Sequence, residues 1–212
     1  AGMLVAPGGG PLFVPDRIGL SLDASGNALL AYEQDQGGGL SQVMITKISP
    51  MGVHLWGLSG VPVSATESGV RFPHVVSTND GDAVVAWTEN PSPSSTDVRL
   101  QRVAPSGALR WAAPLLVEHP TDRYVVTDLL ASGNDAVVAF VTENGGPFGV
   151  AEELLVQRVD PTGAPLWGPS ALTLFDNGSL HGPYPTMVSD GGGGVVVTWE
   201  DATMPEQCRV QR

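Results

Sequence analysis

The sequence predicts an all-β fold, namely a β-propeller of four four-stranded blades. Three observations support this prediction. Short apolar segments rich in Val and Leu recur along the 212 residues, turn residues (including 27 Gly and 18 Pro) separate them throughout, and one segment is repeated four times around an aromatic residue. Apolar runs of five or six residues bounded by Gly, Pro, Asn or Asp are typical of strands.

The repeated segment is the second strand of each unit. It reads AVVAWTEN at 83–90 and AVVAFVTEN at 136–144, and its aromatic residues are Tyr32, Trp87, Phe140 and Trp199. These residues are 53 to 59 positions apart, by the differences between their numbers. A period near 50 indicates a propeller or a solenoid. A strand that is apolar on both faces must lie between neighbouring sheets, so we expect each copy to pack against the next.

The first strand of each unit comes just before this segment. The first strands contain IGLSL, PHVVS, TDLL and PTMVS, and the following turns read DASGN, TNDGD, ASGND and SDGGGG. Gly, Asn and Asp tolerate the positive φ that tight hairpin turns require. The first and second strands are therefore expected to form an antiparallel hairpin.

Third and fourth strands follow after a variable loop. The third strands begin at Val43, Val98, Leu154 and Cys208, and three of them lead through Pro-x-Gly turns into VHLWG, ALRWA and APLWG, where a fourth strand is expected. All five tryptophans occupy two repeat positions, Trp87 and Trp199 in the second strand and Trp56, Trp111 and Trp167 in the fourth. Four short antiparallel strands per unit correspond to a propeller blade.

The ends of the chain complement each other. The units span approximately 17–63, 71–117, 124–174 and 183–212 plus 1–14, within a single domain. The segment from Ala1 aligns without gaps on that from Met51, with Ala6 at the position of Trp56, whereas Arg212 ends a third strand. The N-terminal strand is therefore expected to complete the last blade, which removes free sheet edges. Four blades in one chain, eight blades from two chains exchanging strands, and an excerpt of a longer array all remain open.

The pattern of an Asp-Gly turn, AVVAW, QRV and G-x-LWG resembles the tandem repeats of large secreted and cell-surface bacterial proteins. This resemblance covers essentially the whole chain, although Tyr32, Phe140 and Ala6 depart from it and the third unit has a longer loop, TENGGPFGVAEE. It implies a propeller-like β-repeat with an exported, adhesive or scaffold-like role. It supplies no catalytic residue.

Charge and composition argue against several partners. The formal net charge of −12 would repel nucleic acid and anionic membranes. No segment reads as a transmembrane helix or a signal peptide, so we expect an extracellular or cell-surface protein whose signal has been removed. Cys208 is the only cysteine, which excludes an internal disulfide. Because its repeat equivalents are apolar, we expect it to be a buried thiol.

No catalytic, cofactor or metal-binding residue is predicted. The histidines, at positions 54, 74, 119 and 181, lack metal-ligand spacing and are expected to be surface or edge residues. The acids after the second strand are expected to form a solvated ring paired with periodic basic residues; the acids are Glu33, Glu89, Glu143, Glu200 and Asp201, and the basic residues are Lys47, Arg102, Arg158 and Arg212.

Turn formation also explains three weaker signals. The Asp- and Gly-rich turns do not match a calcium-binding loop, and Gly191 to Gly194 are not followed by the residues of a phosphate loop. The sequon at Asn177 is ordinary turn chemistry, although glycosylation there remains open. Ligand-binding residues are therefore left unassigned.

The sequence thus predicts a non-enzymatic exported propeller module with a binding or structural role and no cofactor. Three alternatives remain: a carbohydrate-binding lectin that uses the variable loops, a strand-exchanged oligomer or filament subunit, and a propeller-type glycosidase. A glycosidase requires two convergent carboxylates in different surroundings. A protein or glycan partner and self-association through the terminal strands are compatible with this prediction.

Overall fold

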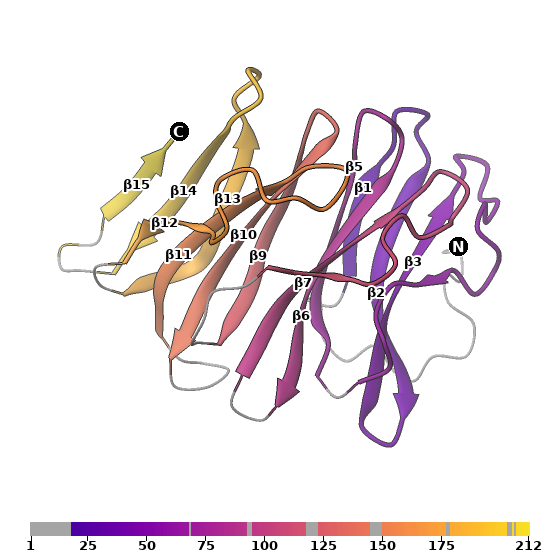
Figure 1. Cartoon of the computed structure of the whole chain (residues 1–212), viewed down its shortest axis with the longest axis horizontal. Helices are drawn as coiled ribbons and strands as arrows, with labels where there is room; N and C mark the ends of the chain where they lie inside the picture. The colour runs from indigo at the N-terminus through magenta and orange to yellow at the C-terminus, as the bar shows by residue number, and fades with distance from the viewer. Residues whose placement is uncertain are drawn as a thin grey trace.

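The computed structural model describes residues 18–212 except 68, 93–94, 118–122, 145–149, 177–178, 203–204 and 206. The predicted N-terminal strand, His119 and Asn177 therefore lie outside the described residues. Within the described part every regular element is a β-strand, and the strands fall into four consecutive antiparallel units (Figure 1). This confirms the prediction of an all-β chain of four units.

The first two units each form a four-stranded sheet in sequence order. Their strands are β1 (Ile18–Leu22), β2 (Ala28–Gly37), β3 (Leu40–Ile48) and β4 (Val61–Pro62), then β5 (Arg71–Ser77), β6 (Ala83–Ser92), β7 (Ser95–Val103) and β8 (Leu115–Val117). The aromatic residues of the second strands sit at equivalent places in these sheets. Tyr32, for example, pairs with Ile18 of the first strand and Met44 of the third.

The last two units are joined in one seven-stranded sheet by a single pairing, Ala151 with Leu180. They contain β9 (Tyr124–Ser132), β10 (Asp135–Asn144), β11 (Val150–Val159) and β12 (Leu172–Phe175), then β13 (Leu180–Ser189), β14 (Val195–Asp201) and β15 (Gln207–Gln211). Among the described strands, β15 pairs only with β14, whereas β3, β7 and β11 each also pair with a fourth strand.

The fourth strands are not where the tryptophan segments predicted them. Each tryptophan segment makes one isolated bridge with the third strand, such as Val103 with Leu109, and the fourth strand begins several residues later. The indole groups explain why the fourth strand begins later. Trp56 Nε1 donates to the Pro105 carbonyl at 2.9 Å, and Trp111 Nε1 donates to the Pro161 carbonyl at 3.0 Å. Trp56 and Trp111 thus contact the Pro-x-Gly turn of the next unit, because the chain leaves its own sheet at this point.

The units stand side by side in a row, with the first and fourth units at opposite ends (Figure 1). Their first strands pack in series, β1 against β5, β5 against β9 and β9 against β13. Three apolar cores fill the joints, and each contains residues of two neighbouring units. Trp87, for example, is completely buried between the first and second units, as the unbroken apolar second strands predicted.

Candidate functional site

The carboxyl groups after the second strands do not form the predicted solvated ring. Glu33, Glu89 and Asp201 are buried, and Glu200 is half-buried. The side chain of Glu143 lies outside the described residues. At the first joint the prediction was wrong because the connection from β4 to β5 lies against this end of the sheets, where Glu67 bonds to Ser41 and to Glu89.

Glu89 forms a carboxyl pair with Glu67 at the joint between the first and second units. Glu67 lies in the connection from β4 to β5, and its backbone exchanges hydrogen bonds of 2.9 and 2.8 Å with Ser41 of the first unit. Its side chain hydrogen bonds to Glu89 of β6. Burial, reinforced by the hydrogen bond and charge of Glu67, raises the pKa of Glu89 to about 7. The pair therefore holds a proton near neutral pH.

Arg99 of β7 connects this pair to a third carboxyl group. Its Nε lies 2.8 Å from Glu89 Oε2, and its Nη2 lies 3.0 Å from Asp97 Oδ2. Glu89 and Asp97 are directly opposite each other in the β6–β7 register. Glu67, Glu89, Asp97 and Arg99 are hereafter called the carboxyl cluster. It contains a carboxyl group whose pKa is raised to about 7, which is the property of a general acid near neutral pH, beside a second carboxyl group and a cation.

A second group of residues, three of them polar, occupies one repeat position on the four first strands. The strand registers place four residues at equivalent positions, each opposite the residue before the second-strand aromatic: Gly19, His74, Asp128 and Thr186. These four residues differ chemically although the surrounding positions repeat. This difference was a signal in the sequence that the prediction did not use.

Asp128 and His74 link three neighbouring first strands at this repeat position. Asp128 Oδ2 accepts from the backbone N–H of Met187 at 2.6 Å, which ties β9 to β13. Burial lowers the pKa of His74, and the charge of Asp128 opposes this shift. His74 is half-buried on β5, the edge strand of its sheet, which agrees with the prediction of a surface or edge residue. Beside it, Phe72 adopts a φ of 53°, where β5 is irregular. Backbone strain of this kind is common at functional sites, so His74 and Asp128 are a second candidate functional site.

The periodic basic residues pair with aspartates at the opposite ends of the units. Their partners in the turn after the first strand are Asp23 for Lys47, Asp80 and Asp82 for Arg102, Asp135 for Arg158 and Asp190 for Arg212. The predicted pairing with the glutamates was therefore wrong. The basic residue lies at the C-terminal end of the third strand, beside the first hairpin turn.

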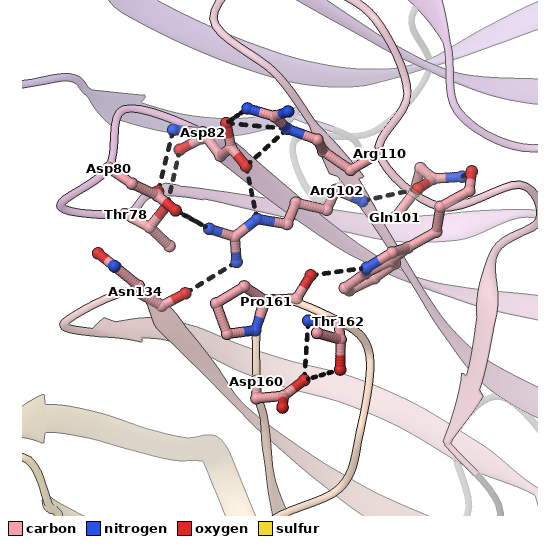
Figure 2. Close-up of polar contacts among 11 residues, drawn as sticks. Thr78, Asp80, Asp82, Gln101, Arg102, Arg110, Asn134, Asp160, Pro161 and Thr162 are labelled. Atoms are coloured by element: carbon pink, nitrogen blue, oxygen red, sulfur yellow. Dashed lines mark hydrogen bonds and ion pairs between the residues drawn. The ribbon is translucent and has the colours of Figure 1, made fainter.

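Figure 2 shows the most buried of these arrangements. Arg102 Nε lies 2.7 Å from Asp82 Oδ2, and Arg102 Nη1 donates to the carbonyl of Asn134 in the third unit at 2.8 Å. Arg158 likewise donates to the carbonyl of Gly193 in the fourth unit. These contacts join successive units, so the turn aspartates have a structural role. No group of three or more potential metal ligands is present among the described residues.

Cys208 is exposed, not buried as predicted. Its repeat equivalents Val43, Val98 and Leu154 are completely buried because the following unit covers them. No described unit follows the fourth, so the same position on β15 has no cover. In the described part of the chain, no helix is long and apolar enough to cross a membrane.

Comparisons with known proteins identify the fold. No family model and no curated protein match the chain. The solved structures that resemble it include an endo-arabinase from Bacteroides thetaiotaomicron, with a TM-score of 0.53 and 11% identity over 92% of this chain and 73% of that chain. An α-L-arabinofuranosidase from Lactobacillus brevis has a TM-score of 0.49 and 10% identity over 92% of this chain and 70% of that chain. At this identity the first likeness supports an all-β propeller-like fold.

These comparisons contradict the predicted non-enzymatic module. The endo-arabinase whose fold the chain resembles is an enzyme by name. The prediction failed for a second reason as well: it assumed that every acid was solvated, whereas Glu89 is buried against another carboxyl group. The carboxyl cluster is therefore the candidate active site.

Proposed function

We propose that this protein is a propeller-type glycosidase in which Glu89 is the proton donor. The observation that carries the proposal is the burial of Glu89 against Glu67: burial, together with the hydrogen bond and charge of Glu67, raises the pKa of Glu89 to about 7. Cleavage of a glycosidic bond needs an acid that remains protonated near neutral pH, because the leaving oxygen must be protonated as the bond breaks.

Asp97 is the second carboxyl group in this proposal. Glu67 and Glu89 share a hydrogen bond. Their carboxyl groups are therefore closer together than the two reacting carboxyl groups of glycosidases, which are roughly 5 Å or more apart. Glu67 therefore holds the proton on Glu89 and does not attack the sugar. Asp97 lies across the β6–β7 ladder from Glu89, where paired Cβ atoms are about 5 Å apart. This spacing suits the short carboxyl separation of retaining enzymes.

Arg99 positions both reacting groups. It contacts the carboxyl oxygens of Glu89 and Asp97 simultaneously, so it fixes their relative orientation. The name of the similar endo-arabinase makes arabinose-containing polysaccharides the first substrates to test.

The test is to incubate the protein with a panel of polysaccharides, arabinans first, and to measure hydrolysis by the reducing ends that are released. We expect Glu89→Gln and Asp97→Asn each to reduce the rate about 10²–10⁴-fold. Glu200→Gln is the matched control, because Glu200 occupies a second-strand exit outside the carboxyl cluster. Hydrolysis of no glycan by the wild-type protein, or full activity in Glu89→Gln, would refute the proposal. Binding of a glycan without cleavage would instead identify a lectin.

We also propose that the four units are blades of one propeller ring. Residues 1–14 would add the fourth strand that the fourth unit lacks among its described residues, either in the same chain or in a second chain. The open edge of β15 and the resemblance of the sequence to exported bacterial repeats support this. An extracellular or cell-surface location follows from the same resemblance and suits a polysaccharide substrate.

A further inference from the structure

The connection from β4 to β5, which brings Glu67 to Glu89, is held at two places. At Glu67 its backbone exchanges hydrogen bonds of 2.9 and 2.8 Å with Ser41 of the first unit. A few residues later, Val70 is completely buried in the apolar core between the first and second units. Gly69 lies between these two points, so its surroundings help to determine where the connection runs.

Gly69 lies directly against the side chain of Asn90, the residue after Glu89 in β6. A Cβ atom at position 69 would lie 2.7 Å from Asn90 Nδ2, 2.9 Å from its Cγ and 3.0 Å from its Cβ. These distances are shorter than the roughly 3.5–4.0 Å at which non-bonded carbon atoms pack. Gly69 also has a φ of 84°, which glycine adopts without the strain that a side chain causes. Glycine therefore allows the connection to lie close to β6.

We propose that Gly69 and Asn90 are positioning residues for the proton donor, because their contact holds Glu67 against Glu89. Gly69 is two positions after Glu67, and Asn90 is next to Glu89. A change in the contact between Gly69 and Asn90 therefore changes the distance between the two carboxyl groups. This inference rests on the proposed glycosidase function, in which Glu67 keeps the proton on Glu89.

The charged groups around Glu89 determine what a displacement of the connection does. Burial is the largest cause of the raised pKa of Glu89, the hydrogen bond and charge of Glu67 add to it, and Arg99 of β7 opposes it. Arg99 also contacts Asp97 on the same strand. Moving Glu67 away removes its hydrogen bond and charge but leaves Arg99 Nε 2.8 Å from Glu89 Oε2. The pKa of Glu89 should then fall, and Glu89 would release its proton at a lower pH.

The test measures the pKa of Glu89 by ¹³C NMR in protein labelled at the side-chain carboxyl carbon of glutamate. Loss of one signal in Glu89→Gln identifies the signal of Glu89. The wild-type pKa should be about 7. Gly69→Ala should lower the pKa of Glu89 by roughly 1, because the new Cβ pushes the connection away from Asn90 and β6. A wild-type pKa in folded Gly69→Ala would overturn the proposal.

Two further variants separate the contact from backbone strain. Gly57→Ala is the matched control: Gly57 has a φ of 79°, but no atom lies within 4 Å of where its Cβ would be, so the pKa of Glu89 should not change. Asn90→Gly removes the three atoms that a Cβ at position 69 would meet. Gly69→Ala/Asn90→Gly should therefore recover the wild-type pKa although the strain at position 69 remains. A pKa as low as in Gly69→Ala, or an equal fall in Gly57→Ala, would show that the contact with Asn90 is not the cause and would overturn the proposal.

Asn90→Gly alone decides the question if circular dichroism shows that Gly69→Ala does not fold. Without the Asn90 side chain the connection loses its support on β6, so the pKa of Glu89 should again fall, and a wild-type pKa in this variant would overturn the proposal.

The NMR measurement does not depend on hydrolysis, so it separates this inference from the proposed function. If the pKa values change as expected but no glycan is hydrolysed, the contact positions Glu67 and the proposed function is wrong. If hydrolysis requires Glu89 but its pKa does not respond to Gly69→Ala, the proposed function stands and the role of Gly69 and Asn90 is refuted.

Discussion

Arg102→Met is expected to destabilise the protein more than any other single change to a charged residue in the second unit. The Arg102 side chain is 1% exposed and lies 2.7 Å from Asp82 Oδ2 and 2.7 Å from Asp80 Oδ2. It also donates to Thr78 and to the carbonyl of Asn134 in the next unit (Figure 2). Methionine retains much of the apolar stem but leaves these acceptors without the guanidinium.

The magnitude follows from the burial of Asp82, whose side chain is 4% exposed. Removing one partner of a buried ion pair costs about 3–5 kcal/mol because the remaining charge is left uncompensated. Arg110 stays 3.0 Å from Asp82 Oδ1 and compensates part of that charge. We therefore expect a loss near the lower limit, about 3 kcal/mol in the free energy of unfolding.

Urea unfolding at pH 7, followed by tryptophan fluorescence, measures this loss. Arg110→Met is the matched control: its side chain is 52% exposed, so the same substitution should cost little. In Arg102→Met/Asp82→Leu both charges are absent, and the double variant should regain part of the stability. A loss below about 1 kcal/mol for Arg102→Met, or equal losses for the two single arginine variants, would refute the reasoning.

Three further predictions concern other positions. Between pH 4.5 and about 7 the folded protein keeps the Glu89 proton, whereas the unfolded chain releases it. Wild-type thermal stability should therefore fall as pH rises through this window. Glu89→Gln should lack this decrease. Trp111→Phe removes the indole donor to Pro161 and should cost about 0.5–1.5 kcal/mol in urea unfolding. Gly107→Ala should cost about 1–3 kcal/mol in the same assay, because Gly107 has a φ of 89° and a Cβ would lie 3.1 Å from the Trp56 ring. Wild-type stability in Trp111→Phe or in Gly107→Ala would contradict the role assigned to that residue.

The repeat allowed much of the fold to be predicted. Hairpin turns and second strands follow from local sequence: the segment AVVAW needs apolar contacts on both faces, and Trp87 is indeed buried between two units. The fourth strands were misplaced because the role of Trp56 is not local. Its partner, the Pro105 carbonyl, is 49 residues away in the next unit.

Less of the candidate site could be predicted. Glu89 repeats with Glu33, so periodicity indicated a solvated position, whereas its distinctive partner Glu67 lies in a connection outside the repeated strands. Likewise, Cys208 was assigned a buried position from its equivalents, but burial depends on a following unit that the described fourth unit lacks. Repeats predict what neighbouring units share and not where one unit differs.

The order of the amino acids is enough to specify four antiparallel β units in this chain, because strand-length apolar runs and turn residues act over a few positions. Which charges meet depends instead on how the units pack. Packing paired Arg102 with the turn aspartates and not with the glutamates, brought Glu67 against Glu89, and left Leu20 and Val210 uncovered at the two ends of the row. These contacts join residues of different units or connections, and no local pattern specifies them.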